Sequence, residues 1–197
     1  VYVITFKFLL LKKIMNAKNK IIERIVRVDQ AGEVGAQRIY NGQKMVFKLL
    51  NNQKEYDAFS EMAQEEQEHL DYFDDLAHKR NIKPTKLAPV FDIGASLLGI
   101  GTALMGPKAA YACTEAVEEI IEEHYEKQIL QLEGVDKEIQ SKIKKFQADE
   151  ANHKNKGIDN GNNSYPLLKK VINKTTEIAI FLAAVSYTHL TLPTIYS

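Results

Sequence analysis

Two short stretches of the sequence each place a glutamate three residues before a histidine. They are Glu66 with His69 and Glu150 with His153. Carboxylate and imidazole groups are common ligands of divalent metals. Residues at i and i+3 lie on one face of a helix about one turn apart, so each pair could hold one ion. One such pair alone is weak evidence, because charged helices produce this spacing by chance.

The hydrophobic pattern around both pairs makes a metal site more specific. Core positions of a bundle helix advance by alternating steps of three and four residues. One set of steps runs through Phe59, Met62, Glu66, His69, Phe73 and Leu76, and another through Ile139, Ile143, Phe146, Glu150 and His153. Each Glu-x-x-His therefore stands where apolar residues are expected. Glu65 and Glu68 fall off the stripe and are expected to reach water.

The same steps place one further glutamate inward on each of two other stretches. Glu33 lies on the stripe in 18–51, and Glu118 lies on the stripe in 107–133. Glu118 belongs to the run "TEAVEEIIEEHYEKQ", where Glu122, one turn further on, competes for the same place. Four buried carboxylates are very costly without compensating charge, and two divalent cations would balance them. The sequence therefore predicts the ligand set of a di-iron or di-manganese carboxylate bundle: Glu33, Glu66, His69, Glu118, Glu150 and His153.

Three more polar residues lie beside the predicted ligands. Asp29 is on the Glu33 stripe and is expected to accept the free N–H of a ligating histidine. A helix-end or surface role fits Asp29 equally well. Tyr125 is on the Glu118 stripe and His124 is beside it, so either could contact substrate or relay protons. Ordinary core packing is the alternative for both.

A helical bundle is needed to bring these residues together. Periodic stretches cover about 18–51, 53–79, 107–133, 136–156 and 166–184, and no alternating strand pattern separates them. The prediction is an all-α, four-helix bundle with an additional C-terminal helix.

An apolar segment, "APVFDIGASLLGIGTALMG" at 88–106, precedes the third bundle helix. Its glycines would allow close packing of a buried helix. The alternative is a helix that lies in a membrane surface or lines an apolar substrate entrance. Pro89, Asp92 and the glycines argue against a helix that spans a bilayer.

Length and composition set broad limits on the function. The 197 residues suit one domain, and a formal net charge of zero gives no reason to expect nucleic acid as a partner. Cys113 is the only cysteine, so no intrachain disulfide can form, and a buried apolar role is expected for it.

Both ends of the chain differ from the middle. Residues 1–14 precede Met15 and are apolar with three lysines, and we interpret them as upstream translation. A short membrane-surface or targeting extension is the alternative. "VSYTHLTLPT" at 185–194 matches the translation of a common transposase sequencing adapter. We therefore interpret 185–197 as adapter read-through, exclude His189 from any site, and expect the domain to cover 15–184.

Four stretches resemble the demethoxyubiquinone hydroxylase family of ubiquinone biosynthesis. They are "RVDQAGEVGAQRIYNGQ" (27–43), "QEEQEHL" (64–70), "GTALMGPKAAYACTEAVEEIIEEHYEKQI" (101–129) and "FQADEANHKNKGID" (146–159). The resemblance covers about 18–184. It implies that the family's metal ligands fall on the six residues named above, and it favours Glu118 over Glu119 and Glu122. It also implies that the family's functional His-Tyr pair falls on His124 and Tyr125.

The resemblance implies a ferritin-like fold with a centre of two iron ions. The implied activity is a monooxygenase that uses O₂ and an external reductant, with NADH as a candidate. The implied substrate is a polyprenylated methoxy-methyl-benzoquinol, hydroxylated in the penultimate step to ubiquinone. The implied location is the membrane surface, on the cytoplasmic face of a bacterial inner membrane, where other ubiquinone-biosynthesis proteins are candidate partners.

Two other classes of function remain open from the sequence. A ferritin- or rubrerythrin-like protein that stores or oxidises iron, or removes peroxide, uses similar ligands. The long apolar segment argues against storage, and a single cysteine excludes a rubredoxin module. A non-catalytic helical scaffold at the membrane surface is the second alternative.

Overall fold

The computed structural model describes residues 2–185, and side-chain environments from residue 6 onward. Residue 1 and residues 186–197 lie outside the described part, and so do His189 and most of the predicted adapter tail. Residues 2–185 contain no strand, so the all-α prediction is confirmed. The helices are α1 (Tyr2–Leu49), α2 (Gln53–Lys79), α3 (Ala88–Leu104), α4 (Pro107–Gln131), α5 (Lys137–Gly161) and α6 (Pro166–Val185).

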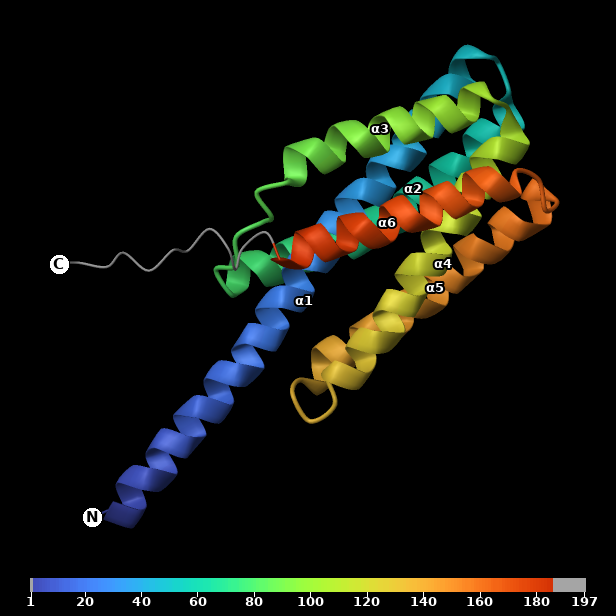
Figure 1. The fold of residues 1–197 in the computed structure, drawn as a ribbon. Coiled ribbons are helices and arrows are strands. Elements are labelled where there is room, and N and C mark those ends of the chain that lie inside the picture. The colour runs from blue at the N-terminus through green and yellow to red at the C-terminus, as the bar shows by residue number, and fades with distance from the viewer. Residues whose placement is uncertain (1, 186–197) are drawn as a thin grey trace.

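Two helical hairpins form the core of the molecule (Figure 1). α1 packs on α2, and α4 packs on α5. Aromatic residues join the hairpins, since the rings of Phe73 on α2 and Phe146 on α5 lie 5.7 Å apart. The predicted register is confirmed for most positions of α2 and α5, whose predicted core residues are buried apart from the half-buried Leu76.

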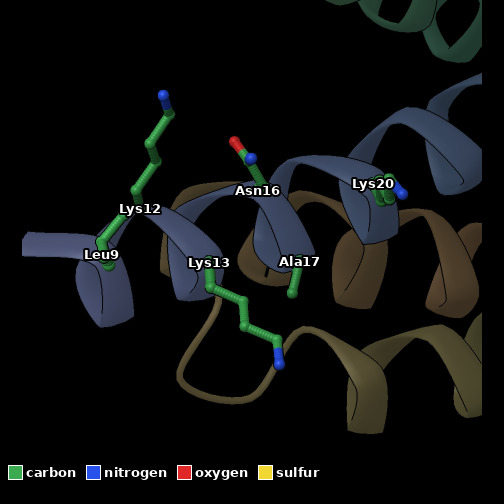
Figure 2. A pocket seen from close by; sticks show the side chains of 6 residues that line it. All are labelled: Leu9, Lys12, Lys13, Asn16, Ala17 and Lys20. Atoms are coloured by element: carbon green, nitrogen blue, oxygen red, sulfur yellow. The ribbon is translucent and has the colours of Figure 1, made fainter. Parts of the chain in front are cut away.

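α1 is longer than the sequence pattern predicts. It begins at Tyr2 instead of near residue 18, and its first turns project beyond the bundle (Figure 1). Residues 6–17 are exposed. A pocket of about 470 Å³ lies along this projecting part of α1, and none of the predicted site residues lines it (Figure 2). The interpretation of residues 1–14 as upstream translation stays a prediction.

α5 also extends further than predicted, to Gly161 instead of about residue 156. The stretch that begins at Gly157 was expected to be a break. Gly157 instead lies against the backbone of α4, where an added Cβ would be 2.7 Å from the Glu115 backbone nitrogen. Glycine here allows two helices to approach closely, and the helix ends at Asn162, whose left-handed conformation caps it.

α3 packs against α1 at a crossing built from glycines. An added Cβ at Gly99 would lie 2.2 Å from the Ile39 carbonyl oxygen, and one at Gly42 would lie 2.9 Å from the Ile100 nitrogen. The only charge of the apolar segment, Asp92, accepts two hydrogen bonds of 3.1 Å from the Arg38 guanidinium on α1. Close packing of this segment is therefore confirmed for one of its faces.

The opposite face of α3 is apolar and exposed. Its outward residues Val90, Ile93, Leu97 and Leu104 are 63–66% exposed. α6 lies beside α4 and α1 and also carries exposed apolar residues, among them Phe181 at 64%. Among the described residues, no helix has both the length and the apolar character needed to cross a bilayer.

Candidate metal centre

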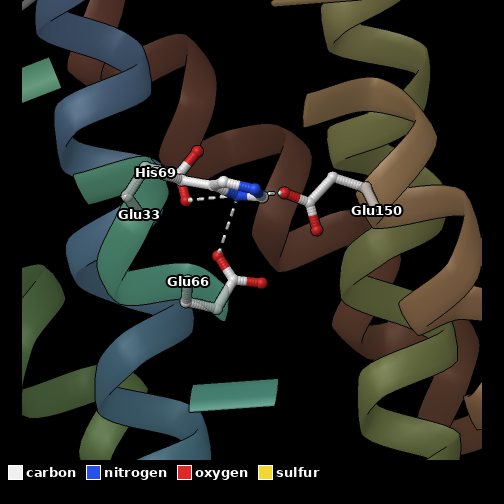
Figure 3. Close-up of side chains that lie close together, drawn as sticks. All are labelled: Glu33, Glu66, His69 and Glu150. Carbon is white, nitrogen blue, oxygen red and sulfur yellow. Dashed lines mark ion pairs between the residues drawn. The ribbon is translucent and has the colours of Figure 1, made fainter. Parts of the chain in front are cut away.

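The middle of the bundle brings together all six predicted metal ligands. Each of them is at most 3% exposed. They form two overlapping groups of four, in which the candidate ligand atoms all lie within 4.8 Å of one another. The groups are Glu33, Glu66, His69 and Glu150 (Figure 3), and Glu66, Glu118, Glu150 and His153. Glu66 and Glu150 belong to both groups, so each could contribute to either of two ion sites.

Both histidines turn Nδ1 toward the carboxylates. His69 Nδ1 lies 3.0 Å from Glu150 Oε1 and 3.7 Å from oxygens of Glu33 and Glu66. His153 Nδ1 lies 3.0 Å from Glu66 Oε1 and 3.2 Å from Glu150 Oε2. Each histidine therefore faces the glutamate of its own helix and the glutamate of the opposite Glu-x-x-His.

Several of these inward atoms are buried and form no hydrogen bond of good geometry in the described part of the chain, although histidine nitrogens lie 3.0 Å from two of the oxygens. They are Glu66 Oε1 and Oε2, His69 Nδ1, Glu118 Oε2 and Glu150 Oε1. A buried polar atom without a hydrogen bond is costly, so a cluster of such atoms at one place fits a site that binds a charged ligand. Coordination to divalent cations would satisfy all five atoms. Oxygen and nitrogen donors without thiolate suit iron or manganese, so the residues fit a pair of such ions.

The pKa values of the cluster show how strongly it needs positive charge. Burial raises the pKa of Glu33 to about 7, and the neighbouring charge of Glu66 contributes to this increase. Burial also raises the pKa of Glu118 well above its ordinary value. Burial lowers the pKa of His153, but contacts with carboxylates outweigh it and raise the value to about 12. Protons and divalent cations would therefore compete for these carboxylates and imidazoles.

The outer nitrogen of each histidine meets a carboxylate on the facing helix. His69 Nε2 lies 3.2 Å from Asp149 Oδ2, and His153 Nε2 lies 2.5 Å from Glu65 Oε2. Such a partner holds the proton on Nε2 and leaves Nδ1 free to bind a metal.

The sequence analysis missed these two carboxylates. Asp149 directly precedes Glu150, and Glu65 directly precedes Glu66. An acidic residue before each Glu-x-x-His is the sequence feature that could have indicated them. Glu65 reaches water as expected, since its side chain is 45% exposed, but it also contacts a buried histidine, which the sequence did not predict. Glu68 is exposed, as expected.

Asp29 is buried but lies beside a different group. Its Oδ1 accepts a hydrogen bond of 2.6 Å from Gln128 Nε2 and lies 3.8 Å from His124 Nε2. The predicted contact of Asp29 with a ligating histidine is therefore wrong. Asp29 stands one turn before Glu33 on α1, which places it level with the later turns of α4 and away from His69.

Glu33 and Glu118 each belong to only one of the two groups of candidate ligands. Each of them accepts a hydrogen bond from a buried tyrosine. Tyr125 donates its hydroxyl hydrogen to Glu33 Oε1, and Tyr40 donates to Glu118 Oε1 at 2.6 Å. Burial, together with the nearby carboxylates, raises the pKa of both tyrosines well above 10, so both stay neutral donors. Tyr40 follows Glu33 by seven residues on α1, so the two lie on the same face of that helix.

The choice among the glutamates of α4 is clear from their surroundings. Glu118 is 1% exposed and faces the centre. Glu122 is paired with Lys154 of α5, and Glu119 accepts a hydrogen bond from Asn173 of α6. Only Glu118 of these three belongs to the candidate metal centre.

An apolar cavity of about 550 Å³ reaches the centre from the side of α3 and α6. Residues of α1, α3, α4 and α6 line it, and its wall includes Glu33, His124 and Tyr125. Leu98 lines it from α3. The interpretation of the apolar segment as the lining of an entrance therefore agrees with the structure.

Paired carboxylate–histidine groups inside a helical bundle define the ferritin-like class of carboxylate proteins, which can hold two metal ions. Comparison with known proteins then specifies the family. Residues 20–183 match the family described as ubiquinone biosynthesis protein COQ7, and the chain belongs to this family.

Similar curated proteins are named as hydroxylases. The chain is 43% identical over 172 residues to the NADPH-dependent 3-demethoxyubiquinone 3-hydroxylase, mitochondrial, of Dictyostelium discoideum, covering 84% of this chain and 78% of that protein. It is 38% identical over 174 residues to the protein of the same name from Caenorhabditis elegans, covering 85% and 91%. It is 38% identical over 166 residues to the 3-demethoxyubiquinol 3-hydroxylase of Rhodospirillum rubrum, covering 83% and 77%. The predicted family, a hydroxylase family of ubiquinone biosynthesis, is thereby confirmed.

Proposed function

We propose that this chain is a di-iron monooxygenase that uses O₂ to hydroxylate a polyprenylated demethoxyubiquinol, in the penultimate step of ubiquinone biosynthesis. The observation that carries the proposal is the apolar cavity with Glu33 and Tyr125 in its wall. A quinol ring in this cavity would lie beside the carboxylate–histidine groups, and its apolar tail would extend toward α3 and α6. The names of the relatives specify a substrate of this kind.

Each residue of the centre has a distinct role in this proposal. Glu33 and His69 would hold one ion, Glu118 and His153 would hold the other, and Glu66 and Glu150 would contribute to both sites. When bound, the irons supply the activation of O₂ and the chemistry of oxygen insertion.

Neighbouring residues support these ligands. The hydroxyl group of Tyr40 orients Glu118, and the hydroxyl group of Tyr125 orients Glu33. Asp149 and Glu65 hold the histidine tautomers. The apolar walls of the cavity exclude water from the reacting ring. A reduced nicotinamide nucleotide is the external reductant, in agreement with the relatives named NADPH-dependent.

The exposed apolar faces of α3 and α6 would attach the protein to the surface of the membrane that holds its substrate. Leu97 and Ile93 on α3 and Phe181 on α6 point outward from helices that also line the cavity. A helix that lies in the interface buries such a face among lipid tails. The quinol would then pass from the bilayer into the cavity without entering water. In a bacterial host this surface is the cytoplasmic face of the inner membrane.

The other functional classes account for fewer of these features. Iron storage or peroxide removal gives no use to an apolar cavity that leads to the ligands. A scaffold gives no reason to bury four glutamates and two histidines together.

The test is hydroxylation of a demethoxyubiquinol analogue by the purified, iron-loaded chain under ¹⁸O₂, with NADPH supplied as the reductant. We expect a product that carries one ¹⁸O atom, detected by mass spectrometry. Glu66→Ala should abolish product formation because it removes a residue that belongs to both candidate groups, and Glu68→Ala, a matched change at an exposed position, should retain it. Absence of product from a folded wild-type chain with two bound irons would contradict the proposed function.

A further inference from the structure

Gln128 is a buried amide that joins two polar residues near the cavity. It lies on α4, is 2% exposed, and follows His124 by four residues, so the two side chains are neighbours on one face of the helix. Its Nε2 lies 2.6 Å from Asp29 Oδ1 and 2.7 Å from His124 Nε2. Both contacts therefore involve the same atom, Gln128 Nε2.

The chemistry of the amide decides the role of each partner. An amide NH₂ group has two hydrogens and no acceptor capacity, so Nε2 can serve both contacts as a donor. Asp29 accepts one hydrogen. His124 Nε2 must accept the other, which requires that this ring nitrogen carries no proton.

The remaining nitrogen of His124 then carries the only ring proton. Burial lowers the pKa of His124 to about 4, and the charges of Lys127 and Arg24 act in the same direction, so the ring is neutral at pH 7. A neutral imidazole with an unprotonated Nε2 is protonated at Nδ1. The side chain of His124 is 25% exposed and forms part of the cavity wall.

We propose that Gln128 is a positioning residue, which holds His124 as the Nδ1–H tautomer and so presents that N–H to an oxygen of the quinol ring. The identity of the ring rests on the proposed function, whereas the tautomer does not. The arrangement gives the cavity one oriented donor among apolar walls, which is how such sites fix the orientation of a ligand.

The first test reads the tautomer directly, with no substrate present. The full chain is labelled with ¹⁵N-histidine and kept free of paramagnetic iron, and the His124 signals are assigned by their loss in His124→Gln. We expect the ¹⁵N shifts of a protonated Nδ1 and an unprotonated Nε2. A protonated Nε2 in the wild-type chain would overturn the proposal.

The second test uses Gln128→Met, which keeps the length of the side chain and removes both donors. We expect His124 to lose its fixed tautomer. We also expect the dissociation constant of a short-tailed demethoxyubiquinone analogue to rise about tenfold, as for the loss of one hydrogen bond. Gln131→Met is the matched control, because Gln131 lies on the same helix and contacts Arg24 at the surface.

The two variants separate a positioning role from a structural one. Unchanged affinity and an unchanged tautomer in Gln128→Met, or equal effects of Gln128→Met and Gln131→Met, would refute the proposal. The first test measures the wild-type chain, so it stays decisive even if Gln128→Met folds poorly. Because that test needs neither iron nor quinone, failure of the proposed function would not be mistaken for failure of this one.

Discussion

The crossing of α3 over α1 provides a quantitative test of the fold around the cavity. An added Cβ at Gly99 would lie 2.2 Å from the Ile39 carbonyl oxygen, which is far inside ordinary contact. Gly99→Ala therefore requires α3 to retreat by about 1 Å from α1, and overpacking of this kind typically costs about 1–3 kcal/mol. Gly101, two residues further on the same helix, has no atom within 4 Å of an added Cβ. Gly101→Ala should instead stabilise the helix by about 0.5–1 kcal/mol.

Urea unfolding of the two variants measures the difference directly. We expect Gly99→Ala to be less stable than Gly101→Ala by about 1.5–4 kcal/mol, from the sum of the two effects. Gly99→Ala should also weaken binding of a quinone analogue, because α3 forms one wall of the cavity. Equal unfolding free energies for the two variants would refute the close contact between α3 and α1.

The carboxylate beside His153, the half-buried His124 and the exposed face of α3 each give another test. Glu65→Ala should weaken iron binding about 10- to 100-fold, because it removes the acceptor of the His153 N–H, and Glu68→Ala should leave iron binding unchanged. Equal iron affinities of the two variants would contradict the role of Glu65 in orienting His153. The free energy of unfolding of the wild type should fall relative to His124→Gln as the pH drops from 6.5 toward 4, because the unfolded chain binds the proton first; parallel pH profiles would be evidence against the lowered pKa. Leu97→Asp should reduce liposome binding about tenfold or more and leave unfolding unchanged, because the side chain is 64% exposed; wild-type liposome binding would count against membrane attachment through α3.

Features that repeat along one helix could be predicted from the sequence. Burial of one face follows a period of three and four residues, so the inward positions of Glu66 and Glu150 followed from their apolar neighbours alone. The same reasoning placed Glu118 inward, although Glu122 remained a competitor until the family resemblance was considered. Lys154 on the facing helix explains why Glu122 stays outside the cluster.

Contacts between helices could not be predicted in this way. Periodicity gives the face of a residue but not its height relative to the neighbouring helix. Asp29 was expected beside a ligating histidine, and it lies instead level with Gln128. The pairing of Asp149 with His69 depends likewise on how α5 is displaced along α2.

The end of α5 also differs from the prediction, because of a glycine. In sequence, a glycine at the end of a periodic stretch is typical of a helix terminus. Gly157 lies inside α5 because the backbone of α4 leaves no room for a side chain. That crowding comes from tertiary packing, which a single helix does not reveal.

The number of iron ions bound per chain tests the central claim most directly. The full chain is loaded with Fe(II) without oxygen, excess metal is removed, and iron and protein are quantified together. Two coordination groups that share Glu66 and Glu150 predict two irons per wild-type chain, and fewer in Glu66→Ala, which removes a ligand from both groups. One iron or none in a folded wild-type chain would contradict the assignment of these residues as a di-iron centre.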